Sequence, residues 1–243
     1  MNRPSIDHLT HGQINATDHL AILCDFDDTA ADCNVATLLL SAFAGEHSPG
    51  MTPGWQVIRQ RFWDSEISLA EYQEKAFARL SQSKREQVSY VQANAKLRRG
   101  FHSLAEYCEL NGIELAIVSH GLDYYVRALL EKEGLGRIPV FAVDTGISKT
   151  GEQTYSYKYT HAECQWTPGN CKCRLVEEYR ERGHSIIYAG DGASDTCPAA
   201  RADFVFARDS LLSFCQWQEL PHRELTDFTV LLDYLVQRHR EDA

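Results

Sequence analysis

Short apolar runs alternate along the chain with amphipathic segments, and this alternation predicts most of the fold. Runs with the length of a buried strand occupy residues 21–24, 113–118, 138–143, 185–189 and 204–206. Helices are predicted between and after them, at 97–110, from Gly121 to about Lys132, and at 170–182, 196–201, 208–217 and 225–239. Strands that alternate with helices form a parallel sheet with right-handed crossovers, so the sequence predicts an α/β fold with a Rossmann-like parallel sheet flanked by helices.

Two regions depart from the alternation. Residues 33–96 contain no convincing strand, and their pattern predicts helices at 35–44, 55–63, 68–80 and 84–93, with a break at 45–54. Ser68 and Glu71 are spaced as a capping box for the third of these helices. We therefore predict an inserted helical cap at 33–96, a core made of 19–32 and 97–243, and a loose tail at 1–18.

The second departure lies between the predicted strand at 138–143 and the helix at 170–182. This segment is rich in Gly, Thr, Tyr and Ser, and Lys149 to Glu152 suits a hairpin turn. Three tyrosines alternate after the turn, at Tyr155, Tyr157 and Tyr159, which is typical of a half-exposed strand.

Composition narrows the functional class. The chain has 243 residues, 44% of them hydrophobic and 24% charged, which is ordinary for a globular protein that buries a sizeable core. A formal net charge of −10 argues against nucleic acid or an anionic membrane as a partner. No apolar run reaches the length of a membrane span, and the polar N-terminus lacks a signal-peptide core. The expected location is the cytoplasm, and the sequence leaves the oligomeric state open.

Eight cysteines are more than usual for such a chain. Cys24 and Cys108 fall in apolar patterns and are expected to be small buried side chains. Cys164, Cys171 and Cys173 cluster, but no C-x₂-C pair repeats at the spacing of a structural zinc site. Reduced thiols are therefore the expected state.

The first apolar run ends in a group of acids, DFDDT, with Asp25, Asp27 and Asp28 within four residues. Carboxylates crowded at the end of a buried strand repel one another and lose hydration, so they need a cation or open water. The simplest alternative is a solvated acidic turn. The other interpretation is a nucleophile and a general acid–base two residues apart, in a loop that curls so that both reach one ligand.

Two more predicted strands end in residues suited to chemistry, and ligands of open α/β sheets bind beyond the carboxyl ends of the strands. Ser119-His120-Gly121 follows residues 113–118, and GDGASD follows 185–189. Asp25 and Asp191 can share a divalent cation, because carboxylate oxygens suit Mg²⁺. Ser119 and the backbone at Gly121 suit an anion. A transferring phosphoryl group also needs positive charge, for which Lys172 is preferred over Lys149 and Lys158.

Taken in order, DFDDT, the serine of VSHG, a lysine at a helix start and GDGASD resemble the four signature motifs of the haloacid dehalogenase-like (HAD) superfamily. The D-x-D-x-T form is that of its phosphotransferases, and the helical insertion resembles the C1-cap subclass, as in phosphoserine phosphatase. The lysine context CKC and the run GDGASDTCPAARADFVFAR resemble the branch that contains the methionine-salvage phosphatases of 2-hydroxy-3-keto-5-methylthiopentenyl-1-phosphate. The resemblance covers residues 20 to 215. Asp28, where Gly is common, and His120, also where Gly is common, depart from the pattern.

The resemblance implies a Mg²⁺-dependent phosphatase of a small-molecule phosphate ester. Asp25 would attack phosphorus and form an aspartyl-phosphate, and Asp27 would act as general acid and then general base. The metal site would comprise Asp25, the Asp27 carbonyl and Asp191, with Asp195 orienting a water ligand of the metal. The expected substrate-binding residues are Ser119, His120, Gly121, Lys172 and Thr29.

Simpler roles exist for several of these residues. Asp195 and Thr29 can be helix caps, and His120 can be a polar residue at a pocket rim. Residues of the inserted segment are expected to select the substrate, and the candidates there are Asn34, Trp55, Arg59, Arg61, Trp63 and Glu66. Other substrates in view are phosphoserine, phosphocholine and a cofactor phosphate. Alternatives from other classes are a phosphoacceptor signalling module and a binding protein without catalysis.

Overall fold

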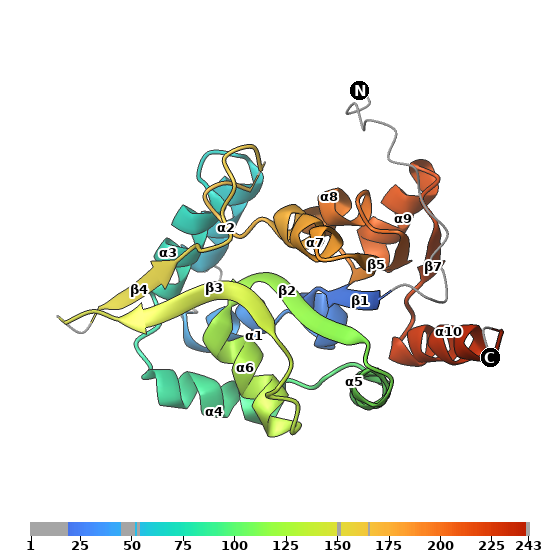
Figure 1. Cartoon of the computed structure of the whole chain (residues 1–243). Helices are drawn as coiled ribbons and strands as arrows, with labels where there is room; N and C mark the ends of the chain where they lie inside the picture. The colour runs from blue at the N-terminus through green and yellow to red at the C-terminus, as the bar shows by residue number, and fades with distance from the viewer. Residues whose placement is uncertain (1–18, 45–51, 53, 150–151, 165, 242–243) are drawn as a thin grey trace. The chain divides into compact units, whose positions relative to one another are not determined.

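Seven strands form one sheet in the order β4-β3-β2-β1-β5-β6-β7 (Figure 1). The structure, a computed structural model, describes residues 19–44, 52, 54–149, 152–164 and 166–241. The strands are β1 (His19–Cys24), β2 (Glu114–Leu122), β3 (Val140–Ile147), β4 (Gln153–Ser156), β5 (His184–Gly190), β6 (Phe204–Ala207) and β7 (His222–Glu224). The pairs β1–β5, β5–β6, β6–β7 and β2–β3 are parallel, and β3–β4 is an antiparallel hairpin. The predicted α/β fold with a mostly parallel sheet is confirmed.

The chain divides into two compact units. Unit 1 comprises Met1–Asp25, Arg99–Ala116 and Lys172–Ala243, and unit 2 comprises Phe26–Arg98 and Ile117–Cys171. Strand β2 therefore begins in unit 1 and ends in unit 2.

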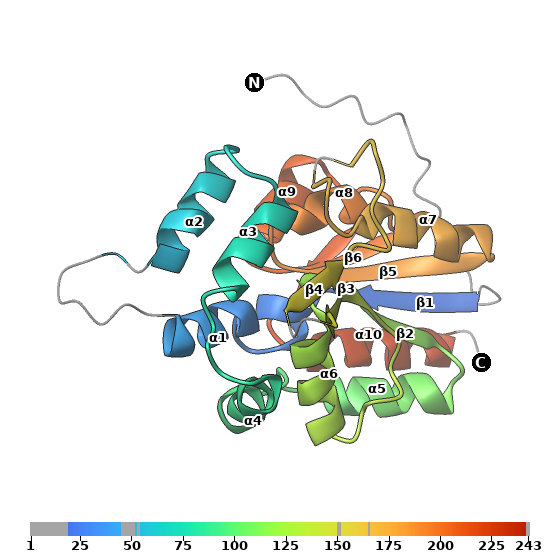
Figure 2. The same cartoon turned by 90° about the vertical axis from the view of Figure 1, so that its left-hand side faces the viewer.

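Unit 1 contains β1 together with β5, β6 and β7, which are its neighbours in the strand order. Residues Ala21–Cys24 of β1 are fully buried and pair in parallel with β5, as expected for a strand covered on both faces. Figure 2 shows α7 (Lys172–Glu181), α8 (Thr196–Ala199) and α9 (Asp209–Trp217) on one face of these strands. The other face carries α5 (Phe101–Leu110) and α10 (Phe228–Glu241), which pack together through an edge-to-face contact of Phe101 and Phe228.

Gly100, at the start of α5, has no room for a side chain. Its φ is +83°, and an added Cβ would lie 2.6 Å from the backbone nitrogen of Thr229. We expect Gly100→Ala to lower the free energy of unfolding by about 3 kcal/mol, because it combines a left-handed backbone with a clash against another helix. Gly112→Ala is the matched control, since its φ is +66° with no atom within 4 Å of the added Cβ, and should cost only about 1 kcal/mol. Urea denaturation measures both, and equal losses would contradict the packing argument.

Unit 2 holds the helices of the inserted segment. They are α1 (Val35–Phe43), α2 (Gly54–Trp63), α3 (Leu69–Phe77) and α4 (Lys84–Asn94), and α6 (Asp123–Lys132) belongs to the same unit. Ser68 and Glu71 form the predicted capping box, and Ser83 and Glu86 form another at α4. Helix α2 packs against α3, and α4 against α6. The predicted tail at 1–18 lies outside the described residues, as does most of the predicted break at 45–54.

Some predicted boundaries are wrong, and one strand is missed. Strand β2 does not end at Val118 but continues through Ser119, His120 and Gly121 to Leu122, with a shift in its pairing register after Val118. Polar residues and a glycine suggest a turn, but here they lie in a bulged strand end. Helix α5 begins at Phe101, after the left-handed Gly100, instead of at residue 97. Strand β7 is missed because three polar residues carry no apolar pattern.

Candidate active site

Four of the predicted site residues meet in unit 1, at the carboxyl ends of β1 and β5. Asp25 directly follows β1, and its N–H donates to the carbonyl of Ala189 in the neighbouring strand. Asp191 directly follows β5, and Asp195 ends the short helical turn Ala193–Asp195. Lys172 is the first residue of α7. Parallel strands bring these positions to one edge of the sheet.

Lys172 lies at the centre of this group. Its Nζ is 2.5 Å from Asp25 Oδ1, 2.7 Å from Asp195 Oδ1 and 3.2 Å from the Ser194 hydroxyl. Its side chain is only 2% exposed, as is expected of a charge that has partners on both sides. Burial lowers the pKa of the ammonium, but the two carboxylates outweigh burial and raise it. Lys172 is therefore a fixed positive charge.

Asp25 and Asp195 respond differently to the same surroundings. Burial, together with the charges of Asp195 and Asp191, raises the pKa of Asp25 well above its ordinary value, although Lys172 opposes the shift. Burial also acts on Asp195, but the charge and hydrogen bond of Lys172, with further donors, hold its pKa below the ordinary value.

Four donors surround the carboxylate of Asp195. Oδ1 accepts from Lys172 and from the Tyr188 hydroxyl at 2.6 Å, and Oδ2 accepts from the N–H groups of Asp191 and Gly192 at 3.1 and 3.0 Å. Gly190 makes room for this packing, since a Cβ there would lie 2.7 Å from Asp195 Cγ. Asp195 thus fixes the turn that carries Asp191.

A divalent cation suits the same acids. Asp25, Asp191 and Asp195 each offer a carboxylate oxygen, and these oxygens lie within 4.8 Å of one another. Hard oxygen ligands of this kind suit Mg²⁺. Four donors already bond to the carboxylate of Asp195, which favours Asp25 and Asp191 over Asp195 as direct ligands of a cation.

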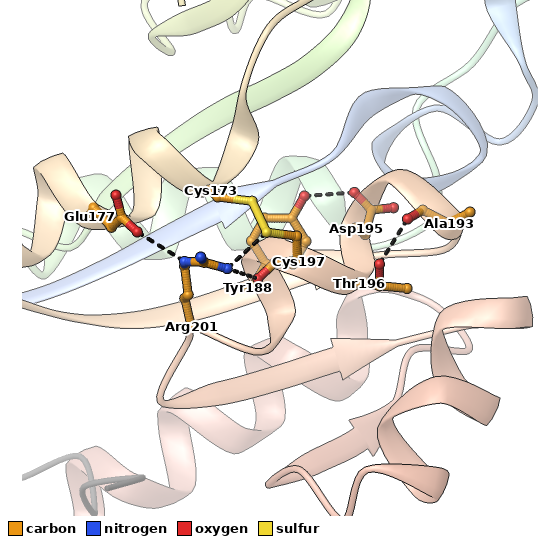
Figure 3. The surroundings of a disulfide bond; sticks show 8 residues. All are labelled: Cys173, Glu177, Tyr188, Ala193, Asp195, Thr196, Cys197 and Arg201. Carbon is orange, nitrogen blue, oxygen red and sulfur yellow. Dashed lines mark hydrogen bonds and ion pairs between the residues drawn. A yellow bond between two sulfur atoms is a disulfide. The ribbon is translucent and has the colours of Figure 1, made fainter. Parts of the chain in front are cut away.

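A disulfide joins the segments that carry Lys172 and Asp195. Cys173 and Cys197 are bonded, and Figure 3 shows the bond beside Tyr188 and Asp195. Arg201, which also binds Glu177, reaches the Cys197 sulfur. The expectation of reduced thiols is wrong for this pair, because only the fold brings together residues that are 24 positions apart. Cys24 and Cys108 are buried thiols outside the disulfide, as expected.

In unit 2, the rest of the acidic motif forms one irregular helical turn, Phe26–Ala30. Asp28 has a φ of +61°, a left-handed conformation that glycine adopts easily and that aspartate tolerates. Its carbonyl accepts from Arg98 and its carboxylate from Asn34. Thr29 is fully buried, and its carbonyl also accepts from Arg98. Arg98 thus stabilises the turn through its backbone carbonyls.

Both carboxylate oxygens of Asp27 accept hydrogen bonds. Oδ1 accepts from the N–H of Val35 at 2.6 Å, and Oδ2 accepts from the hydroxyl of Tyr125 at 2.9 Å. Burial raises the pKa of Asp27 to about 6, although both hydrogen bonds oppose the shift. A carboxyl group with such a pKa can both give and take a proton near neutrality.

Ser119, His120 and Gly121 lie together at the end of β2. The Ser119 hydroxyl oxygen accepts from the N–H of Gly121 at 2.9 Å, so this N–H, which the sequence suggests for an anion, already has a protein partner. Two side-chain amides fix the backbone: Asn170 donates to the Ser119 carbonyl and Gln73 to the His120 carbonyl. The ring of His120 packs edge-on against Trp166.

The two alternative lysines are exposed, and several of the residues predicted to select the substrate have structural partners of their own. Lys158 is 62% exposed and pairs with Asp144, and Lys149 is exposed. Asn34 caps α1, and Arg61 pairs with Glu66 at the surface. Trp55 is buried beneath the guanidinium of Arg59, whereas Trp63 is 58% exposed.

Sequence reasoning missed the residues that hold the acids and the end of β2 in place. Tyr188 and Tyr125 each donate a hydroxyl to one of them, and Gln73 and Asn170 fix the strand that carries Ser119. A tyrosine within the apolar run 185–189 is a usable signal, since a buried hydroxyl needs a partner. The other three lie in segments whose partners only the fold reveals.

A mostly parallel α/β sheet with acids and a lysine gathered at its strand ends is typical of phosphatases of the HAD type. The family model described as "Putative Phosphatase" matches residues 20–230. The 2-hydroxy-3-keto-5-methylthiopentenyl-1-phosphate phosphatase of Geobacillus kaustophilus (strain HTA426) is 32% identical over 224 residues, which are 90% of this chain and 96% of that protein. The protein of the same name from Geobacillus thermodenitrificans (strain NG80-2) is 31% identical, over 89% and 95% of the two chains.

Solved structures agree on the fold. A phospho-aspartyl intermediate analogue of phosphoserine phosphatase matches with a TM-score of 0.63 at 20% identity, covering 90% of this chain and 99% of that one. A substrate-bound phosphoserine phosphatase complex matches with the same score at 19% identity and the same coverage. The chain belongs to the Putative Phosphatase family, and it is a phosphatase of the HAD type. None of the helices among the described residues is long and apolar enough to cross a membrane.

Proposed function

We propose that the protein is a Mg²⁺-dependent phosphatase that hydrolyses a small-molecule phosphomonoester through an aspartyl-phosphate on Asp25. The observation that carries the proposal is the placement of Lys172, buried and 2.5 Å from Asp25. A nucleophilic carboxylate meets a phosphate dianion only where positive charge offsets the repulsion, and Lys172 supplies such a charge.

The proposed reaction has two halves. An oxygen of Asp25 attacks phosphorus, the bond from phosphorus to the ester oxygen breaks, and Asp27 gives its proton to the departing alkoxide. Asp27 then removes a proton from a water molecule that attacks the same phosphorus, which releases inorganic phosphate and restores the Asp25 carboxylate. Ser119 and Lys172 bind phosphoryl oxygens in this scheme, Thr29 supports the loop, and His120 and Gly121 line the substrate side.

Asp25, the Asp27 carbonyl and Asp191 would hold Mg²⁺, which supplies further positive charge for the phosphoryl oxygens. Asp195 would orient Lys172 and the Asp191 turn, in keeping with its four hydrogen bonds. Residues 33–96 would form a cap over a core of 19–32 and 97–243, and closure of such a cap excludes water from the reaction.

The proposed substrate is 2-hydroxy-3-keto-5-methylthiopentenyl-1-phosphate, the compound in the names of the two Geobacillus relatives. Phosphoserine, which the solved relatives' names point to, is the second candidate, although those structures are at most 20% identical. Phosphocholine and cofactor phosphates remain further candidates from the sequence.

A panel of phosphate esters, assayed for phosphate release with and without Mg²⁺, tests the proposal. We expect kcat/KM for the methylthiopentenyl ester to exceed that for phosphoserine by at least about 100-fold, a ratio typical of substrate discrimination by a shaped pocket. Chelation should reduce the rate at least tenfold, and added Mg²⁺ should restore it. A preference for phosphoserine would contradict the proposed substrate. Full activity after exhaustive chelation would contradict the proposed dependence on Mg²⁺.

A further inference from the structure

A buried tyrosine hydroxyl points at one of the proposed catalytic acids. Tyr125, on α6, has no exposed surface, and its hydroxyl donates to Asp27 Oδ2 at 2.9 Å. The Phe26 and Phe77 rings lie beside its ring, with centroids 6.3 and 6.4 Å away. Because close-packed aromatic neighbours restrict the ring, the position of the hydroxyl is fixed.

The contact between Tyr125 and Asp27 also explains why residue 121 is a glycine. A Cβ on Gly121 would lie 2.1 Å from the Tyr125 hydroxyl oxygen and 2.9 Å from Asp27 Oδ2. Any larger residue at 121 would therefore occupy the space in which the hydroxyl meets the carboxylate. The glycine at the end of β2 has a role within unit 2 that is separate from anion binding.

Asp27 is held on both sides. The N–H of Val35, at the first position of α1, fixes Oδ1, and Tyr125 fixes Oδ2. Two donors on different oxygens stop the carboxyl group from rotating about its bond to Cβ. The backbone N–H of Ala36 is a further donor to the same carboxyl group. A carboxylate has about four lone pairs, so these three donors leave room for a proton to be carried to or from a ligand.

We propose that Tyr125 is the positioning residue for the general acid: it aims Asp27 at the leaving-group oxygen, and Gly121 provides the space for this contact. The inference rests on the proposed function, in which Asp27 protonates that oxygen. Proton transfer depends strongly on distance and angle, so a carboxyl group that is free to rotate would transfer its proton less efficiently. The loss should grow with the need of the leaving group for a proton.

Tyr125→Phe tests this with two model esters of similar size. Benzyl phosphate releases a strongly basic alkoxide, which needs the proton, whereas p-nitrophenyl phosphate releases a stable phenolate, which needs little help. The measured quantity is kcat/KM, because it reports the steps up to departure of the leaving group. We expect a fall of about 10- to 100-fold for benzyl phosphate and less than about threefold for p-nitrophenyl phosphate, within the range that general acid catalysis contributes.

Tyr124→Phe is the matched control. Tyr124 is the neighbouring buried tyrosine of α6, and its hydroxyl donates to Gln87 Oε1 at 2.5 Å instead of to Asp27. Removing this hydroxyl also costs a buried tyrosine hydrogen bond, here to a neutral amide, so any change should be equal for the two esters. The ratio of the two kcat/KM values does not depend on how much of a preparation is folded.

Val35→Pro provides a second test if Tyr125→Phe fails to fold. Proline is tolerated at the first position of a helix and removes the N–H that binds Oδ1. It also replaces a buried valine side chain, and that loss of packing should affect the two esters equally. It should also lower kcat/KM more for benzyl phosphate. Equal losses for the two esters in the variant tested, or no loss, would overturn the positioning role. If the wild-type protein turned over neither these esters nor the panel, the proposed function would fail instead.

Discussion

Asp25→Asn should abolish phosphatase activity, with kcat reduced by at least about 10⁴-fold, because an amide cannot act as the nucleophile that forms the phospho-enzyme. The substitution keeps the shape of the side chain. It also leaves Lys172 with Asp195 at 2.7 Å, so the buried ammonium retains a carboxylate partner. We therefore expect the variant to fold, with a melting temperature within a few degrees of the wild type.

Two measurements separate loss of the nucleophile from general damage. After acid quenching during turnover, mass spectrometry should find phosphate on the peptide that contains Asp25 in the wild type and none in Asp25→Asn. Asp32→Asn is the matched control, since Asp32 is an exposed aspartate of the same loop, and its activity should not change. A phosphorylated peptide or normal turnover in Asp25→Asn would place the nucleophile elsewhere.

The fold was largely predictable because most of the strands that pair in parallel are apolar on both faces. Such runs are visible in the sequence, and β1, β5 and β6 lie within two residues of their predicted bounds. Boundaries failed where tertiary contacts outweigh local pattern. The residues Ser119 to Gly121 continue β2 because Asn170 and Gln73 bind its carbonyls, and neither partner is near in sequence.

The residues of the candidate site also fall into those that the sequence indicates and those that only the fold reveals. Its acids and lysine could be selected because carboxylates at a strand end and a lysine at a helix start are unusual for a buried core. The groups around them could not, since their partners are distant: Tyr125 is 98 residues from Asp27, and the bonded cysteines are 24 apart. Residue type and spacing therefore indicate the chemistry, whereas the groups that aim the reactive side chains depend on the fold.

Lys172→Met should have the second large effect, on stability as well as on activity. The Lys172 side chain is 2% exposed, and its ammonium lies between Asp25 and Asp195. Removing it leaves buried carboxylates without their cation, and a broken buried ion pair costs about 3–5 kcal/mol. Phosphate release should fall at least about 10³-fold, because the phosphoryl group loses a fixed positive charge.

The same variant should respond more strongly to Mg²⁺. A cation bound among three carboxylates replaces part of the missing charge, and a ligand that binds only the folded state stabilises it. The melting temperature of Lys172→Met should therefore rise more with Mg²⁺ than that of the wild type. The added stability should not restore turnover, since a cation among the acids does not reproduce the ammonium on the phosphoryl oxygens.

Lys158→Met is the control for this prediction, because Lys158 is the rival lysine from the sequence and its ion pair with Asp144 is 62% exposed on the lysine side. Exposed pairs contribute little, so neither its melting temperature nor its activity should change measurably. Thermal melts across a Mg²⁺ titration, together with phosphate-release assays, measure both variants. If Lys158→Met lost activity while Lys172→Met kept it, the positive charge that serves the phosphoryl group would have to come from the β3–β4 hairpin region instead of from the start of α7.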